Sequence, residues 1–169
     1  NFNDFMYNLS YWSSWSNGFN IWKSEFDKID KNLKLNKLFP HTSLFLTQHQ
    51  AKLFCINDNL LFDVQRIPKR GGHNKFEAFT IEYPSLLDEC CKKGHISTKC
   101  KKHILFGIMV QFLPSLLFNK YIIRIETFDD TGFRNNLKKY YPSYAYWLVL
   151  ISVLGVPFRL FCRKLKNKR

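Results

Sequence analysis

The stretch CCKKGHISTKC, from Cys90 to Cys100, and His103 just beyond it contain three cysteines and two histidines. Thiolates and imidazoles are the ligands of tetrahedral structural zinc sites. Cys91, His95, Cys100 and His103 therefore form a candidate zinc-binding set. Structural zinc sites usually present two cysteines in a tight turn, and the adjacent pair Cys90-Cys91 does not supply one. We therefore expect no metal and no other cofactor, and keep a zinc-dependent interaction module only as an alternative function.

The same cysteines are candidates for a disulfide if the compartment is oxidising. Cys91 and Cys100 are the favoured pair, and Cys55 is a further partner for the adjacent cysteines. The remaining alternative is a lysine-rich loop with unpaired thiols. We interpret the stretch chiefly as a positively charged loop that precedes an apolar segment.

Signatures of enzymatic chemistry are absent from the sequence. It contains no nucleophile elbow, no phosphate-binding loop, no dinucleotide fingerprint and no HExxH motif. Gly71 and Gly72 lie between two candidate strands, so they predict a hairpin turn rather than a phosphate cradle. We therefore predict that the protein is not an enzyme.

The excess positive charge is confined to two parts of the chain. The net charge is +13, yet residues 1–89 and residues 126–158 each contain equal numbers of basic and acidic side chains. Residues 90–125 and residues 159–169 contain basic residues and no acidic ones. Both clusters flank uncharged apolar runs, and this arrangement is typical of a membrane topology signal because Lys and Arg stay on the cytoplasmic or matrix side. An rRNA-binding protein more often spreads its basic residues over loops and tails.

Residues 1–40 form an aromatic-faced amphipathic segment. Apolar residues recur every three or four positions from Phe2 to Ile29, which predicts helix, with a break at Asn17-Gly18 and an end at Pro40. The chain begins with Asn rather than Met, so we expect a removed leader or a longer protein. The stripe suits packing in its own domain, a membrane interface or a partner subunit. The residues predicted to face a partner or lipid are Phe5, Trp12, Trp15, Phe19, Trp22 and Phe26.

Residues 41–135 are predicted to form a small antiparallel β domain. Between residues 43 and 82, short β-branched and aromatic runs alternate with turn residues, which is typical of a β-meander. Residues 104–112 and 120–127 would add a hairpin around Pro114. Residues 103–119 also carry no charge except a histidine, so a short membrane span is the alternative, although its apolar portions are shorter than the roughly 20 residues a spanning helix needs.

Residues 136–169 are predicted to form a C-terminal membrane helix with a basic tail. Tyr140 to Phe158 carry no charge, and a helix of that length covers close to 30 Å, the thickness of a hydrocarbon core. Aromatic residues gather at its start and basic residues follow its end, as in a transmembrane helix. Ser152, Gly155 and Pro157 leave a buried core helix as the alternative. The predicted membrane-anchoring residues are Tyr144, Trp147, Leu148, Leu150, Ile151, Leu154, Phe158 and Arg159.

The sequence therefore predicts an α+β protein with an N-terminal amphipathic helix, an antiparallel β-meander domain and a C-terminal transmembrane helix. The expected function is that of a non-catalytic accessory subunit of a membrane complex, whose partners are other subunits and the lipid bilayer. An organellar (mitochondrial) inner membrane is the favoured location, and the endomembrane system is the alternative. A basic rRNA-binding protein of an organellar ribosome is the other open hypothesis, with nucleic acid bound by the two basic clusters.

Overall fold

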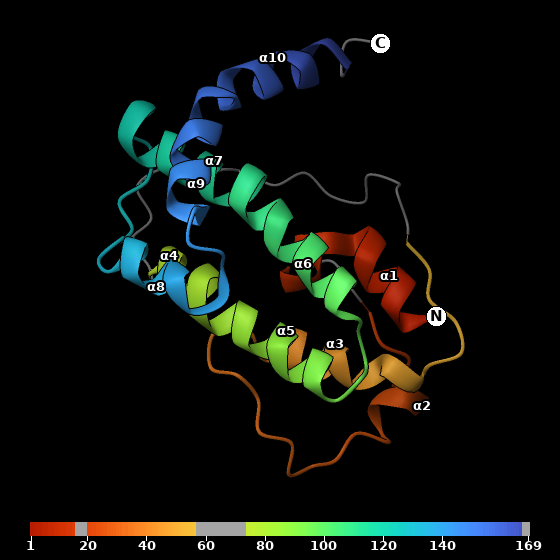
Figure 1. Cartoon of the computed structure of the whole chain (residues 1–169). Coiled ribbons are helices and arrows are strands. Elements are labelled where there is room, and N and C mark those ends of the chain that lie inside the picture. The colour runs from red at the N-terminus through yellow and green to blue at the C-terminus, as the bar shows by residue number, and fades with distance from the viewer. Residues whose placement is uncertain (16–19, 57–73, 167–169) are drawn as a thin grey trace. The chain divides into compact units, whose positions relative to one another are not determined.

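Every regular element in the part of the chain that the computed structural model describes, residues 1–15, 20–56 and 74–166, is helical (Figure 1). The described residues belong to two compact units. One lies within Asn1–Gln65 and Glu82–Leu105, and the other within Arg66–Ile81 and Phe106–Arg169. The division falls inside two continuous helices, residues 75–92 and 98–122, so each unit combines segments that are far apart in the sequence.

The first unit begins with a short capped helix. It contains α1 (Phe2–Leu9), the 3₁₀ turn η1 (Ser10–Ser14), α2 (Lys23–Phe26), α3 (Pro40–Leu46), the 3₁₀ turn η3 (Thr47–Gln50), α5 (Tyr83–Lys92) and most of α6 (Thr98–Gly107). The Asn1 side chain accepts a hydrogen bond from the backbone N–H of Asp4 and caps α1. α1 ends at Ser10, whose φ of 52° is left-handed. The predicted N-terminal helix therefore ends earlier than expected, and the predicted break at residues 17–18 lies outside the described residues.

A buried network of hydroxyl groups lies at the centre of the first unit. The Tyr83 hydroxyl is 2.5 Å from Ser13 Oγ, and Ser13 Oγ donates to the Ser10 carbonyl at 2.7 Å. Thr42 Oγ1 donates to the Ser13 carbonyl at 3.3 Å. Burial raises the pKa of Tyr83 and outweighs the hydrogen bond to Ser13. The network joins η1, α3 and α5 with neutral hydrogen-bonding groups, which is how a core tolerates buried polar side chains.

The second unit includes two π-helical turns that each lie just before a proline, one in the helix 75–92 and one in the helix 98–122. It contains α4 (Lys75–Glu77), most of the π-helical turn η4 (Ala78–Glu82), the π-helical turn η5 (Ile108–Phe112), α7 (Leu113–Leu117), the π-helical turn η6 (Phe118–Ile122), α8 (Phe133–Tyr140), α9 (Ala145–Leu154) and α10 (Val156–Lys166). η4 lies two residues before Pro84 and η5 lies two residues before Pro114. Proline lacks an N–H and its ring displaces the carbonyl four residues earlier, so a wider turn before it relieves the crowding.

Side chains from α8 to α10 hydrogen-bond to carbonyl groups in these two turns. The Tyr141 hydroxyl donates to the Phe79 carbonyl at 2.7 Å, and the Arg159 guanidinium donates to the Val110 carbonyl. In the α register, an amide at position 114 would donate to the Val110 carbonyl, whereas an amide at position 84 would donate to the Thr80 carbonyl rather than to Phe79. Arg159 therefore takes the place of the amide that Pro114 lacks. Tyr141 instead adds a hydrogen bond within the π-helical turn that precedes Pro84.

The predicted antiparallel β domain is wrong. Residues 43–47 lie in α3 and η3, residues 75–82 lie in α4 and η4, and residues 104–112 belong to the helix 98–122. Residues 52–56 have no regular structure, residues 57–73 lie outside the described part, and residues 120–122 continue the helix. Short apolar runs do not distinguish a buried strand from a buried helix. The buried residues distinguish a helix from a strand here, because they recur every three or four positions. They are Phe76, Thr80, Tyr83, Leu87 and Cys90.

Replacing Tyr141 with Phe removes the hydroxyl that donates to the Phe79 carbonyl. We expect Tyr141→Phe to lower the free energy of unfolding by about 1–2 kcal/mol, because the partly buried Phe79 carbonyl loses a hydrogen bond. Tyr140→Phe is the matched control, since the neighbouring tyrosine is half-buried and contacts Lys139 through its ring. Chemical denaturation of both variants measures the difference, and equal losses would contradict the role of the Tyr141 hydroxyl.

Candidate functional site

The cysteine- and histidine-rich stretch joins α5 to α6 instead of forming an extended loop. Cys90 and Cys91 lie in the last turns of α5, and Cys100 and His103 lie in α6. Gly94 has a left-handed φ of 75°, and the His95 N–H donates to the Cys90 carbonyl at 3.0 Å. This connection ends α5 in the manner of a glycine-containing helix C-terminus.

The four proposed zinc ligands have other neighbours. Cys91 Sγ lies 3.7 Å from Thr98 Oγ1, and Cys100 Sγ donates to the Asn3 carbonyl at 3.6 Å. The His95 ring stacks on His49 and the His103 ring stacks on Tyr7. Within the described residues, no group of three or more His, Cys, Asp or Glu side chains is placed to hold a metal.

All five thiols are free, so the Cys91–Cys100 disulfide is not formed in this structure. Cys90 is buried, and burial, together with the neighbouring Cys100 and Cys91, raises the pKa of the Cys90 thiol to about 12. A thiol with such a pKa is almost entirely protonated near neutral pH and is a poor nucleophile. The arrangement therefore makes Cys90 a core residue and gives no support to thiol catalysis.

Three acidic residues that lie just outside residues 90–125 pair with four of the seven basic residues of this cluster. Asp88 binds Lys92 at 2.9 Å and Lys101 at 2.7 Å, Glu89 binds Lys93 at 2.6 Å, and Asp130 binds Lys120 at 2.7 Å. Hydrogen bonds from Lys101 and Lys92 lower the pKa of Asp88 and keep it charged. The positive cluster seen in the sequence is therefore partly offset by ion pairs.

A hollow of about 380 Å³ lies within the second unit, and its polar rim is satisfied internally. Its walls are Leu117, Tyr121, Ile122, Asp130, Phe133, Tyr146, Leu150 and Val153. Burial alone would raise the pKa of Asp130, but hydrogen bonds from Lys120 and Tyr121 lower it overall. The Asp130 carboxylate is therefore committed to an ion pair and is not available as a general base.

The N-terminal aromatic residues divide into buried and exposed groups. Phe5 packs on Phe54, with ring centroids 4.8 Å apart, and is half-buried. Phe19 lies outside the described residues. Trp12 and Trp15 contact each other, with ring centroids 5.2 Å apart, and both are exposed. Trp22 and Phe26 are also exposed. The stripe therefore does not form one continuous face, since only part of it is free to meet a partner.

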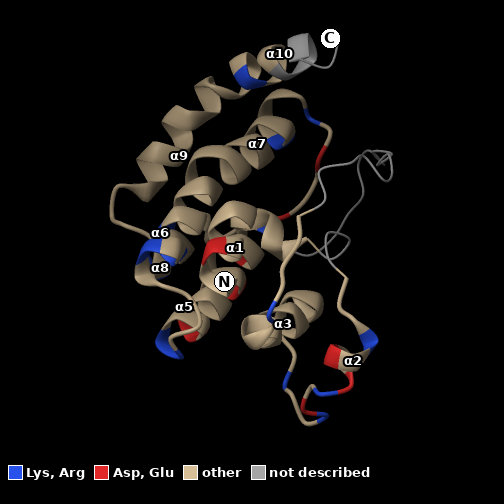
Figure 2. Ribbon diagram, turned by 90° about the vertical axis from the view of Figure 1, so that its right-hand side faces the viewer, with Lys and Arg blue, Asp and Glu red and all other residues tan. Residues whose placement is uncertain are grey.

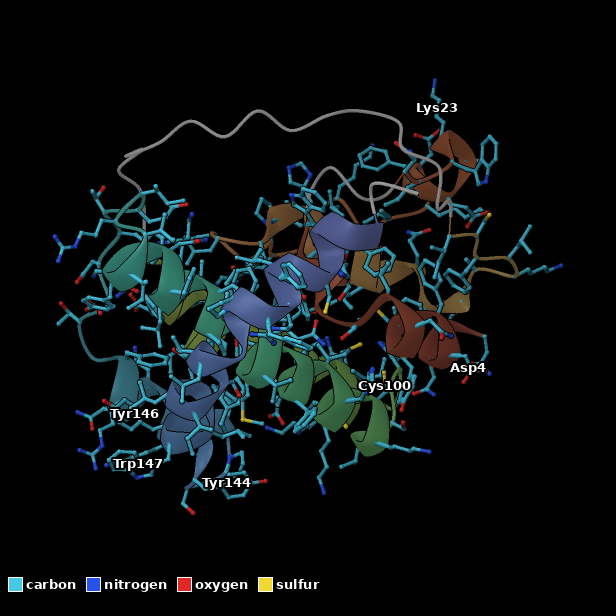
Figure 3. The ribbon with its side chains drawn as sticks, turned by 90° about the horizontal axis from the view of Figure 1, so that it is seen from above. Asp4, Lys23, Cys100, Tyr144, Tyr146 and Trp147 are labelled. Carbon is cyan, nitrogen blue, oxygen red and sulfur yellow. The ribbon has the colours of Figure 1, made fainter. Side chains whose placement is uncertain are left out.

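An exposed apolar stripe runs along α9 and α10. Its members recur at spacings of three and four residues, and each side chain is 59–81% exposed. We call this surface the outer stripe; it consists of Tyr144, Trp147, Ile151, Leu154, Phe158 and Phe161. Figure 3 shows Tyr144 and Trp147 extending outward from α9. α9 carries no charged residue, whereas α10 does, as the ribbon colours of Figure 2 show.

The opposite side of α9 and α10 packs within the second unit. Ala145, Val149 and Val156 are buried, and Leu148 and Leu150 are half-buried. α9 packs against α7 and η5. Of the eight predicted anchoring residues, five belong to the outer stripe, while Leu148, Leu150 and Arg159 do not. Arg159 donates to the Val110 carbonyl and lies 3.4 Å from the Ser152 carbonyl through Nη2.

Within the described part of the chain, one helix and one bent pair of helices are long and apolar enough to be candidate membrane spans. Thr98–Ile122 is one continuous helix of 25 residues, with 56% of its most apolar window buried. Ala145–Leu154 and Val156–Cys162 meet the criterion together, but they are bent by 49° at Gly155. A buried helix of a soluble protein meets the same criterion. The membrane helix predicted for residues 140–158 is divided here into α9 and α10, which together remain a candidate for a broken span or a re-entrant segment.

Among the described residues, internal packing explains neither the outer stripe nor the exposed Trp12, Trp15 and Trp22. The cysteines, the acidic residues and the hollow all have neighbours that account for them. No protein-family model, curated protein or solved structure matches this chain. A function is therefore best sought in what covers the outer stripe.

The stacked histidines predict a pH dependence of stability. Burial and the neighbouring His49 lower the pKa of His95, so the folded chain keeps His95 neutral at pH values where the unfolded chain protonates it. The unfolded state then binds more protons as the pH falls below about 6.5, and stability is lost from there downward.

We expect His95→Gln to make the loss of stability between pH 7 and pH 5 shallower than in the unsubstituted chain. The unfolding temperature measured at several pH values between 7 and 5 gives the pH dependence of each chain. His41→Gln, at an exposed position in α3, is the matched control. A pH dependence unchanged by His95→Gln would show that the stacked pair does not contribute.

Proposed function

We propose that this chain is a non-catalytic accessory subunit of a membrane protein complex, attached to the bilayer through α9 and α10. The observation that carries this proposal is the outer stripe, a row of six large apolar side chains left exposed on two consecutive helices. Soluble monomers rarely expose contiguous apolar surface of this kind without a partner or a membrane to cover it.

The composition of the stripe favours lipid as that cover. Tyr144 and Trp147 lie at its start, and aromatic side chains of this type are favoured at the level of the headgroups. Ile151, Leu154 and Phe158 follow, and α9 contains no charged residue that would oppose burial in hydrocarbon. Burying each large apolar side chain contributes about 1.5–3 kcal/mol, so the six together supply enough energy for stable attachment.

The rest of the chain supports a role in binding rather than in catalysis. Asp88 and Asp130 are held in ion pairs, and the Cys90 thiol is protonated and buried. The exposed Trp12, Trp15 and Trp22 provide surface for neighbouring subunits. The ion pairs of Lys92, Lys93, Lys101 and Lys120 leave fewer unpaired cations in residues 90–125 to neutralise phosphate, which weakens the case for nucleic-acid binding.

Vesicle flotation with a variant of the outer stripe tests the proposal. We expect Ile151→Asn with Leu154→Asn to weaken partition into phospholipid vesicles by about a hundredfold, because two exposed apolar side chains worth about 3 kcal/mol are removed. Both positions are exposed, so the helical circular-dichroism spectrum should not change.

The matched control is Leu53→Asn, which changes another highly exposed leucine outside the stripe. We expect this control to float like the unsubstituted chain. If all three proteins float equally, the outer stripe is not the attachment surface, and if the unsubstituted chain does not float, the membrane function is wrong.

A further inference from the structure

We infer that α9 and α10 insert into one leaflet of an anionic bilayer and return without crossing it, so that α8 and the C-terminal tail lie on the same side. The inference rests on the proposed function and adds the depth, the direction and the lipid class. It differs from the transmembrane helix that the sequence predicts.

The length of α9 is the first reason. α9 contains ten residues, Ala145–Leu154, and at about 1.5 Å per residue it extends about 15 Å. A hydrocarbon core is about 30 Å thick, so α9 reaches about half of it. The chain then turns by 49° at Gly155. With a bend of 49°, both ends of the pair lie on one side of the bilayer when each helix is inclined by about 25° to the membrane plane, and helices of this length then stay within one leaflet.

The bend is fixed by the hydrogen bonds of Arg159. This side chain lies in the first turns of α10 and donates to the Val110 carbonyl of η5, the carbonyl that the residue at Pro114 cannot serve. The second guanidinium nitrogen, Nη2, lies 3.4 Å from the Ser152 carbonyl in α9. One cation therefore connects α10 both to the preceding helix and to η5. Straightening α9 and α10 into one continuous span would break these contacts.

The character of α10 changes along its length. Phe158, Leu160 and Phe161 are exposed, and the sequence places basic residues among and after them. A helix with apolar side chains on one side and Lys or Arg on the other is typical of an interfacial helix that lies in the plane of the membrane. α9 differs, because it carries no charge and can enter the hydrocarbon.

The charges that flank the two helices support a return to the same side. Arg134, Lys138 and Lys139 precede α9, and the basic residues from Arg159 to Arg169 lie in α10 and beyond. No acidic residue occurs after Asp130. The three basic residues before α9 and the six from Arg159 onward place positive charge on both flanks, whereas a crossing helix normally keeps its basic flank on one side. An anionic leaflet can hold both flanks at once, so its negative headgroups are the complementary partner.

The test places one reporter thiol on each side of α9 and α10 in the full-length chain. Cys162 is one reporter and Asn135→Cys, at an exposed position of α8, is the other. Cys55 and Cys91 are changed to Ser, and the buried Cys90 and Cys100 are kept. Ser143→Cys, exposed just before α9, replaces Asn135→Cys if that variant folds poorly. The protein is reconstituted from detergent into vesicles that contain phosphatidylglycerol, labelled with an impermeant maleimide and analysed by intact mass.

We expect each chain to carry two labels or none, because both reporters lie on one side of the bilayer. Chains with a single label, whose second thiol reacts only after detergent is added, would overturn the inference and establish a crossing. A Cys162→Ser version of the reporter chain has one reporter thiol and must carry at most one label. This control shows that the buried Cys90 and Cys100 are not labelled.

A second arm addresses the lipid. Vesicles without phosphatidylglycerol should bind at least about tenfold less protein, because the basic flanks lose their partner. Equal binding to both vesicles would overturn the anionic part of the inference. No association with either vesicle would instead refute the proposed function, so the two failures are distinguishable.

Discussion

The packing of the C-terminal helices depends on two buried prolines that interrupt the backbone hydrogen bonds of long helices. Pro84 and Pro114 lie inside long helices, where each removes a backbone donor and displaces the preceding turn. The chain responds with a π-helical turn before each proline. The carbonyl groups of Phe79 and Val110 then accept hydrogen bonds from Tyr141 and Arg159. A buried carbonyl without a donor is destabilising, so the prolines give the C-terminal helices specific positions to occupy.

This constraint also explains why the apolar surface of α9 and α10 is one-sided. The hydrogen bond of Arg159 and the packing of Ala145, Val149 and Val156 hold one side of the two helices against η5 and α7. The other side carries the large apolar residues and has no cover within the second unit. The same contacts keep the bend at Gly155, which limits how deeply the pair can enter a bilayer. The packing of α9 and α10, the bend between them and their basic flanks are all consistent with attachment to one leaflet.

The sequence predicted some of these features and missed others for identifiable reasons. The apolar segment after Tyr140 was predictable, because an uncharged run with aromatic residues before it and basic residues after it is a strong pattern. Trp147, Ile151 and Leu154, which the sequence proposes as anchoring residues, are exposed on it. Its break was not, since the bond between Arg159 and Val110 joins residues far apart in the sequence. The strand prediction failed because β-branched and aromatic runs are equally compatible with a buried helix.

The candidate site shows the same limit. The residues 90–125 contain no acid, so the sequence presents them as a strongly basic cluster. Asp88 and Asp130 lie just outside that range and neutralise Lys101 and Lys120 once the helices pack. The cysteines and histidines share a short stretch, but α5 and α6 direct them to different neighbours. Proximity in sequence therefore overstated both the charge and the metal-binding capacity of this region.

The most direct measurement of the central constraint is a double-mutant cycle between Pro114 and Arg159, followed by chemical denaturation in mild detergent. Arg159→Met should cost about 1–3 kcal/mol in the unsubstituted chain, because the Val110 carbonyl loses its donor. Pro114→Ala restores a backbone amide that can donate to that carbonyl, so in this background Arg159→Met should cost at least about 1 kcal/mol less. Equal costs in the two backgrounds would contradict the account, because Arg159 would then not be replacing the missing amide.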